Sequence, residues 1–223
     1  MKKRELKNAL FDQVARVAKA MANPKRLELV ALLTQGPKAV EDLATEIGVS
    51  INLASSHLKV LRVACLVETE RQGKRIVYRL ASSGVADLWV HLHELAEARL
   101  AELQDVVAKL GHSGEWRELS RRELLKQARA GELVLLDVRP VTEYEYAHLP
   151  HARSIPHDEL LGRLAELPRD KPVVAYCRGP YCLFARDAVQ LLRKRGFDAA
   201  LLGDGTAEWQ AKKATSPALA RSL

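Results

Sequence analysis

Residues 173–196, "VVAYCRGPYCLFARDAVQLLRKRG", decide the fold of the second half of the chain. An apolar, β-prone run leads into a short loop with two cysteines, and a helical segment follows. Further β-prone and helical segments alternate with it along the chain, among them "LVLLDV", "LLGRLAEL" and "AALLG". This alternation predicts an α/β domain with a mainly parallel sheet, in which functional sites form at the carboxyl ends of the strands.

The loop in this stretch has the features of a nucleophilic thiol site. Cys177 ends the predicted strand, and the helix that starts near Leu183 directs its amino end back at the loop. Backbone N–H groups and the helix dipole at that end favour an anionic thiolate or persulfide. Arg178 and Arg186 add positive charge. We therefore predict that Cys177 is a nucleophile near neutral pH.

The other two cysteines call for separate interpretations, because three in all are too few for a disulfide framework and are expected to be free thiols. Cys65 has apolar neighbours and is expected to be a small buried residue without a sensor role. Cys182 is either a packing residue or a resolving thiol that attacks persulfidated Cys177 and closes a disulfide or polysulfide. Spacing alone does not establish disulfide geometry, but we favour the resolving role.

The length and charge of the chain predict two domains and a polyanionic partner. A chain of 223 residues is long enough for two domains that each bury a core. The best candidate for a linker is "GHSGE" at 111–115, between residues 1–110 and 116–223. Residues 1–80 hold 15 Lys and Arg against 8 Asp and Glu, whereas residues 81–223 hold 20 of each. The net charge of +7 therefore lies in the first segment, as in nucleic-acid-binding domains. Without a membrane-spanning apolar run or a signal core, we expect a cytoplasmic protein without membrane contact.

The first half has the pattern of a helix-turn-helix domain. One helical face is predicted from apolar residues at three- and four-residue spacing: Leu6, Leu10, Phe11, Val14, Val17 and Met21. Asn23 and Pro24 start a second helix that closes at Gly36. Two short helices follow, "AVEDLATEIG" and "SINLASSHLKVLRVAC", with Gly48 in the turn and Ser50 as the N-cap.

The helix that starts at Ser50 is predicted to read DNA, and a hairpin after it to contact the DNA backbone. Short donor-rich side chains that suit base edges in a major groove share one face of this helix: Asn52, Ser55, Ser56 and Lys59, with His57 beside them. Ser50 at the start of the helix is also expected to contact DNA. The core-facing positions are predicted to be Leu53, Leu58 and Leu61. The runs "LVETER" and "RIVYRL" flank "QGK" and predict a hairpin whose cations Arg71, Lys74 and Arg75 meet phosphates or a minor groove.

Four motifs in residues 10–80 together resemble the ArsR-type winged helix-turn-helix repressors: "MANPKRLELVALL", "VEDLATEIGVS", "ASSHLKVLRVACLV" and "RQGKRIVYRL". The resemblance implies a homodimer on a double-stranded DNA operator, with residues 50–63 as the recognition helix and the hairpin as a wing. It also implies that the first helix and a long helix after the wing pair with the partner subunit. Residues 85–110 predict that long helix by an apolar stripe of Leu88, Leu92, Leu95, Leu103 and Leu110.

The metal sites of many ArsR-type proteins are not predicted here. The helix before the recognition helix has no cysteine. The long helix offers Asp87, His91, His93 and Glu94, but the two histidines are two residues apart and point to different helical faces. Tetrahedral coordination requires converging ligands, so we expect surface histidines, no metal and no cofactor.

The second half resembles a single rhodanese domain over about residues 116–210, on residues 134–156 together with the cysteine loop and its helix. The resemblance implies that Cys177 takes sulfane sulfur from a donor and holds it as a persulfide. Asp137, Arg139 and Glu143 are expected to be structural, beside the loop. Cys182 stands where rhodaneses often carry a cation, which weakens capture of an anionic donor such as thiosulfate. Phosphatase and arsenate-reductase chemistry would need an arginine at position 183, which is leucine.

These patterns favour a homodimeric repressor whose rhodanese domain senses reactive sulfur through Cys177 and Cys182. The expected donor is a polysulfide, a low-molecular-weight persulfide or thiosulfate, and the enzymatic step is a sulfurtransferase half-reaction used for regulation. One alternative is a working sulfurtransferase that is merely tethered to DNA. Another is an inert C-terminal dimer partner, which a cysteine at the strand-to-helix turn argues against.

Overall fold

The computed structural model describes residues 2–109 and 120–214, which fall into two compact units, Met1–Trp89 and Val90–Leu223. The division between the units lies inside helix α5 (Ser83–Arg99). The predicted linker at 111–115 lies outside the described residues. Within the described part of the chain, no helix is long and apolar enough to cross a membrane.

The first unit has the predicted helices, with the predicted caps. Before α5 it contains α1 (Lys3–Met21), α2 (Pro24–Leu33), β1 (Lys38–Ala39), α3 (Val40–Glu46), α4 (Ile51–Val63), β2 (Val67–Gln72) and β3 (Arg75–Leu80). The Asn23 side chain accepts a hydrogen bond from the Arg26 N–H, and Ser50 accepts one from the Leu53 N–H, as N-caps do. The core of the helix-turn-helix is a cluster of fully buried leucines: Leu29, Leu43, Leu58 and Leu61.

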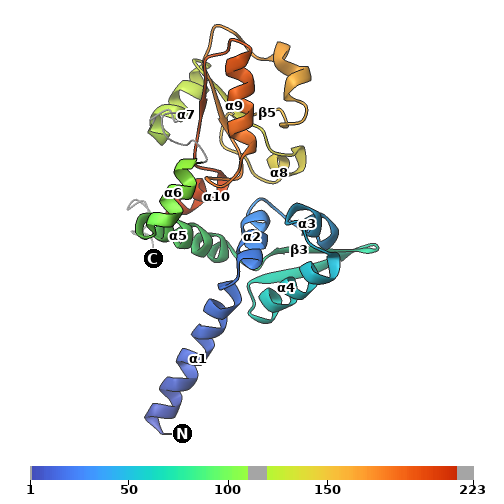
Figure 1. Ribbon diagram of the computed structural model, residues 1–223, viewed down its shortest axis with the longest axis vertical. Helices are drawn as coiled ribbons and strands as arrows, with labels where there is room; N and C mark the ends of the chain where they lie inside the picture. The colour runs from blue at the N-terminus through green and yellow to red at the C-terminus, as the bar shows by residue number, and fades with distance from the viewer. Residues whose placement is uncertain (1, 110–119, 215–223) are drawn as a thin grey trace. The chain divides into compact units, whose positions relative to one another are not determined.

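A two-stranded wing follows the helix-turn-helix. Strands β2 and β3 pair antiparallel from Val67 opposite Leu80 to Gln72 opposite Arg75, and β1 pairs with the other edge of β3. The turn between them holds Gly73, whose φ of 61° is in the left-handed region that such two-residue turns require. Figure 1 shows the hairpin projecting from the helices of its own unit, as the sequence predicts.

Helix α1 extends away from the rest of the first unit (Figure 1). Its predicted apolar face is largely exposed in the single chain. At its carboxyl end Ala20 and Met21 are buried. Nearer its amino end, four apolar side chains of the predicted face are between 51% and 69% exposed: Leu6, Leu10, Phe11 and Val14.

The prediction of one continuous helix over residues 85–110 is wrong, because the structure divides this segment into two helices. Helix α5 ends at Arg99, and α6 (Ala101–Lys109) begins after a break at Leu100. At the break the Gln104 side-chain amide donates to the Glu97 carbonyl over 2.7 Å, so a side chain partly replaces the missing helical hydrogen bonding. Leu110 lies outside the described residues.

Two predictions of burial around α4 are also wrong. Leu53 is 46% exposed, and Ala54 takes the core position with Leu58 and Leu61, since this set shares one helical face. Cys65 is an exposed free thiol. It follows the helix end with a φ of 59°, and its N–H bonds the Arg62 carbonyl as in a left-handed helix terminus. That conformation directs the side chain outward in spite of its apolar neighbours.

The second unit contains a four-stranded, fully parallel sheet in the order β5-β4-β6-β7, which confirms the predicted α/β class. Its strands are β4 (Val134–Asp137), β5 (Arg153–Ser154), β6 (Val173–Tyr176) and β7 (Ala199–Leu201). Its helices, after α6, are α7 (Arg121–Ala130), α8 (Val141–Tyr146), the 3-10 helix η1 (Leu160–Glu166), α9 (Phe184–Lys194) and α10 (Thr206–Ala214).

Alternating side chains of the central strands form two cores, one on each face of the sheet. On one face Leu136 and Ala175 pack with α9 residues such as Val189. On the other face Leu135 and Tyr176 pack with residues of α7 and α10. Both faces of the sheet are therefore covered. Parallel strands made of continuous apolar runs require this, because their side chains on both faces are apolar.

The left-handed conformation of Cys65 makes a stability prediction. We expect Cys65→Gly to raise the free energy of unfolding by about 0.5–1 kcal/mol, because glycine avoids the roughly 1–2 kcal/mol penalty of this conformation and loses part of that gain to unfolded-chain entropy. Urea denaturation of the reduced protein measures it. The neighbouring Ala64→Gly is the control and should be destabilising, since Ala64 has a φ of −83°. A Cys65→Gly variant no more stable than the parent chain would contradict the account.

Candidate functional site

The candidate site lies where β4 and β6 end side by side. These parallel neighbours pair in register up to Asp137 opposite Tyr176, so Cys177 leaves the sheet at the same edge as Asp137. Cys177 is almost fully buried and packs in the core beneath α9. Helix α9 starts at Phe184, close to the predicted position, and its amino end follows the loop directly.

Cys177 and Cys182 are joined in a disulfide across the loop, with their Cα atoms 6.3 Å apart. The loop turns tightly enough for the Cys182 N–H to bond the Gly179 carbonyl over 3.1 Å. Cys182 is partly buried and packs against the same core as Cys177. The structure therefore brings the two sulfurs together, and Cys182 occupies a packing position as well.

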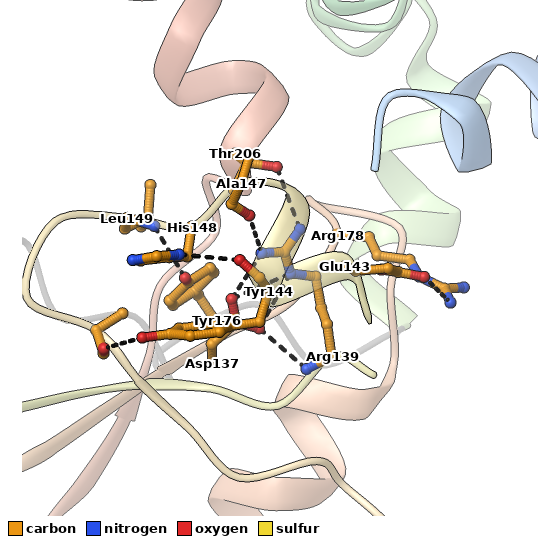
Figure 2. Close-up of polar contacts among 11 residues, drawn as sticks. Asp137, Arg139, Glu143, Tyr144, Ala147, His148, Leu149, Tyr176, Arg178 and Thr206 are labelled. Atoms are coloured by element: carbon orange, nitrogen blue, oxygen red, sulfur yellow. Dashed lines mark hydrogen bonds and ion pairs between the residues drawn. The ribbon is translucent and has the colours of Figure 1, made fainter. Parts of the chain in front are cut away.

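A buried ion pair lies beside the loop. Asp137 and Arg139 are both 0% exposed, and the Arg139 Nη2 atom donates to an Asp137 carboxylate oxygen over 2.6 Å (Figure 2). Arg139 also donates to the Ala147 carbonyl over 2.7 Å and to the Thr206 hydroxyl over 3.4 Å. Burial disfavours the guanidinium charge, but the hydrogen bonds and the charge of Asp137 outweigh it and raise the pKa of Arg139.

Tyr176, the residue before Cys177, extends this buried network. Its hydroxyl accepts a hydrogen bond from the Leu149 N–H over 3.0 Å, and its ring lies under the Arg139 guanidinium (Figure 2). Burial raises the pKa of Tyr176, and the charge of Asp137 and a hydrogen bond to it add to the effect. The phenol is therefore neutral and holds the end of β6 to the segment at Leu149.

The two loop arginines have different surroundings. Arg178 forms a bidentate pair with buried Glu143 of α8, from Nη2 over 2.6 Å and from Nε over 2.9 Å. The positive charge that Arg178 was predicted to add at the loop is thus partly compensated. The Nε and Nη2 atoms of Arg186 are buried, and among the described residues they have no hydrogen-bond partner. Of the two, Arg186 has capacity left for an anion.

The histidines of α5 differ from one another, which overturns the prediction of two surface residues. His91 is exposed, but His93 is 5% exposed and its Nε2 lies 3.3 Å from a carboxylate oxygen of buried Glu208 in α10. A metal site with three or more His, Cys, Asp or Glu side chains is not found in residues 2–109 and 120–214. His93 was misplaced because its partner is 115 residues away in sequence.

The predicted DNA-reading residues do share the outer side of α4. Asn52, Ser56 and Lys59 are exposed, while Ser55 and His57 are partly exposed. In addition, the Ser56 hydroxyl donates to the Asn52 carbonyl over 3.0 Å.

The cations of the wing have different surroundings. Lys74 lies exposed in the turn, and the Arg71 Nε donates to the Gly73 carbonyl over 3.1 Å. The Arg75 guanidinium reaches back to α3, where it pairs with Asp42 over 2.6 Å. Because this pair is solvent-exposed, it is weak and leaves Arg75 available to a stronger anion.

Sequence reasoning missed the surroundings of Tyr181, which lies between the two cysteines. Its ring meets the His93 ring edge-on, at 5.6 Å between centroids, and its hydroxyl hydrogen-bonds the Glu97 carboxylate. Burial is the main cause that raises the pKa of Tyr181, and Glu97 adds to it. The position of Tyr181 inside the loop was a signal in the sequence, whereas nothing in the sequence pointed to α5 as its neighbour.

Comparison with known proteins identifies both units. Residues 23–69 match the family model for bacterial regulatory proteins of the arsR family, and residues 120–212 match the model for the rhodanese-like domain. The HTH-type transcriptional regulator Rv0324 of Mycobacterium tuberculosis is 46% identical over 204 residues, which cover 92% of this chain and 90% of that protein.

Two further similarities cover less than half of the chain. The HTH-type transcriptional regulator NmtR of Mycobacterium tuberculosis is 43% identical over 76 residues, which are 34% of this chain and 63% of NmtR. The solution structure of the homodimeric winged helix-turn-helix domain of Mb0332 from Mycobacterium bovis is 43% identical, with a TM-score of 0.42, and covers 46% of this chain and 93% of that one. Because the similarity to Rv0324 extends over both units, the chain belongs to the ArsR family of bacterial transcriptional regulators, as a member with a C-terminal rhodanese domain.

Proposed function

We propose that this regulator is a homodimeric repressor whose affinity for its operator is set by sulfur chemistry at Cys177. The observation that carries the proposal is the disulfide between Cys177 and Cys182 at the carboxyl end of β6. A rhodanese-type nucleophile and a second thiol within bonding reach form a unit that can be oxidised and reduced. In such a unit the bond state is a signal that the DNA-binding domain can use.

The chemistry runs in two balanced steps from a low-molecular-weight persulfide. The Cys177 thiolate attacks the outer sulfur of the donor, forms a new S–S bond, and expels the donor's thiolate. The Cys182 thiolate then attacks the Cys177 Sγ, closes the disulfide, and breaks the bond to the outer sulfur, which leaves as hydrosulfide. Two thiols are thereby oxidised by two electrons, and one sulfane sulfur is reduced to sulfide.

The surroundings of the loop support this sequence of steps. Arg186 offers buried N–H groups without partners among the described residues, at the helix amino end where an anionic donor or persulfide would lie. Arg178 is tied to Glu143 and therefore anchors the loop to α8. This anchor holds the Cys177 end of the loop while the Cys182 end is released, so the Cys182 thiol has only a short distance to return and the disulfide re-forms fast.

The same geometry disfavours a tethered sulfurtransferase as the main function. A sulfurtransferase has to keep its persulfide until an acceptor arrives, but here Cys182 competes for it from within the loop. Each protein chain should therefore consume one donor and stop until a reductant reopens the disulfide. Multiple turnovers with thiosulfate and cyanide, at unchanged operator affinity, would instead establish the tethered enzyme.

The thiol chemistry predicts distinct products for single substitutions. After treatment with a low-molecular-weight persulfide, mass spectrometry should show the intramolecular disulfide in the parent chain and one added sulfur atom on Cys177 in Cys182→Ser. Cys177→Ser should show neither product at this loop. Operator affinity should change about 5- to 150-fold on treatment of the parent, the range of ordinary allosteric coupling, and stay constant in Cys177→Ser.

Cys65→Ser is the matched control for this experiment, because Cys65 is an exposed thiol outside the loop. It should respond to the persulfide as the parent chain does. A full change in operator affinity in Cys177→Ser would refute the proposed role of the rhodanese domain.

The surface of the first unit predicts how DNA is bound. Asn52→Ala on α4 should weaken operator binding by about 1–3 kcal/mol and affect random DNA far less, because we propose that the exposed Asn52 side chain reads a base edge. Lys74→Ala in the wing should weaken binding to the operator and to random DNA by the same factor. The slope of log affinity against log salt concentration should fall by about one released counterion. Fluorescence anisotropy at several salt concentrations measures both, with Lys126→Ala on α7 as the control. Equal losses on operator and random DNA for Asn52→Ala would argue against base reading.

The exposed apolar face of α1 predicts the homodimer. A second copy that covers Leu6, Leu10, Phe11 and Val14 would bury a surface that a monomer rarely leaves open. We expect Phe11→Glu to shift the protein to monomers in sedimentation experiments at micromolar concentration and to reduce operator binding. Tyr146→Glu, at a similarly exposed aromatic position of α8, should remain dimeric. Unchanged sedimentation of Phe11→Glu would exclude this face as the interface.

A further inference from the structure

The cysteine loop contacts helix α5 through Tyr181. His93 and Glu97 lie one helical turn apart on α5, and both meet Tyr181, one through the edge-on ring contact and the other through the hydroxyl. All three residues belong to the unit Val90–Leu223, so the contact lies within one compact body. Tyr181 itself directly precedes Cys182 in the chain.

Glu208 of α10 links the same two segments from the other side. One of its carboxylate oxygens lies 3.3 Å from the His93 Nε2, and the other accepts the Gly205 N–H over 2.8 Å. A Cβ atom at Gly179 would lie 3.0 Å from both oxygens, so the loop backbone rests directly on this carboxylate. A Cβ atom at Gly205 would come within 2.6 Å of the Arg178 backbone, which places the start of α10 against the loop as well.

We propose that Tyr181 transmits the bond state of Cys177 and Cys182 to helix α5, and this inference rests on the redox function proposed above. While the disulfide is closed, Cys182 is held with its Cα 6.3 Å from that of Cys177, and Tyr181 is held with it. When a low-molecular-weight dithiol reduces the bond by thiol–disulfide exchange, Cys177 and Cys182 become thiols, the dithiol leaves as its own disulfide, and that tether is gone. Tyr181 is the member of the contact that can respond, because it is 37% exposed while His93 and Glu208 are buried.

The contact changes through the position of Tyr181 and not through its charge. Burial and Glu97 raise the pKa of the Tyr181 phenol, so the hydroxyl remains protonated and donates to Glu97 at neutral pH in either state. Movement of the ring therefore alters the packing on His93 and the hydrogen bond to Glu97 together. Because these two contacts lie one turn apart on the same helix, a displacement of the loop can change the orientation of α5.

Helix α5 is a suitable receiver because of its place in the chain. It begins at Ser83, three residues after strand β3 of the wing ends at Leu80. It also carries three exposed leucines of the stripe that the ArsR resemblance assigns to the subunit interface: Leu88, Leu92 and Leu95. A change at its carboxyl-terminal half thus acts on the element that continues into the wing and the proposed interface.

Hydrogen–deuterium exchange of the backbone amides at 90–99 tests this inference in the full-length protein, oxidised and reduced. The parent chain should show a several-fold difference in exchange between the two states. Tyr181→Ala should reduce the difference to less than about twofold, the level at which coupling is negligible. Tyr181→Phe keeps the ring contact and loses the hydroxyl, so it should retain part of the difference. Tyr146→Ala, at an exposed tyrosine of α8, should behave as the parent chain does.

Operator affinity and disulfide formation are measured on the same samples, which separates this inference from the proposed function. If amide exchange in α5 differs between the oxidised and reduced protein while operator affinity does not, the result supports transmission through Tyr181 and contradicts the proposed regulatory function. Operator affinity that responds while α5 exchange does not, or while Tyr181→Ala keeps the full difference in α5, overturns the transmission and leaves the function standing. If Tyr181→Ala does not form the disulfide, Tyr181→Phe decides, and a difference equal to that of the parent chain then counts against the inference.

Discussion

The buried ion pair of Asp137 and Arg139 is the interaction on which the C-terminal unit depends. Both groups are 0% exposed, and a buried charge without its partner costs about 3–5 kcal/mol. The pair is tolerated because Arg139 also donates to Ala147 and Thr206, which come from the ends of α8 and α10. One guanidinium thereby fixes the positions of three segments around the cysteine loop. The buried pair of Asp137 and Arg139 therefore restricts the positions that the segments beside the cysteine loop can take.

The charges around the cysteine loop suit the proposed redox switch better than a sulfurtransferase that turns over many substrates. Glu143 compensates the charge of Arg178. Cys182 stands where the rhodanese resemblance places a donor-binding cation, so we expect this loop to hold an anionic donor less strongly. Among the residues that the structure describes, no partner fills the buried Nε and Nη2 atoms of Arg186 near the helix amino end. With a second thiol in reach, the proposed persulfide would be resolved inside the loop. Sulfur chemistry that ends in a disulfide records exposure to a donor instead of turning donors over.

Regulation then requires that a small local change reaches the DNA-binding surface. Coupling of about 1–3 kcal/mol is sufficient, which corresponds to the loss or gain of one or two packed contacts. Tyr181 makes one aromatic contact, with His93, and one hydrogen bond, with Glu97, both on the helix that continues from the wing. Contacts of these two kinds are typically worth about 0.5–1.5 kcal/mol each. The proposed route does not require a metal, since its signal would be a covalent bond within the chain.

The sequence by itself determined the local features: the helix caps at Asn23 and Ser50, the wing, the parallel strands, and the cysteine at a strand end. Each depends on residues within a few positions, which periodicity and turn chemistry report. It did not determine that Cys65 is exposed or that the helix after the wing breaks at Leu100, because a single φ angle and one side-chain contact decide them. Only the tertiary structure placed His93 beside Glu208, 115 residues away, since burial there is set by packing between distant segments and leaves no local pattern.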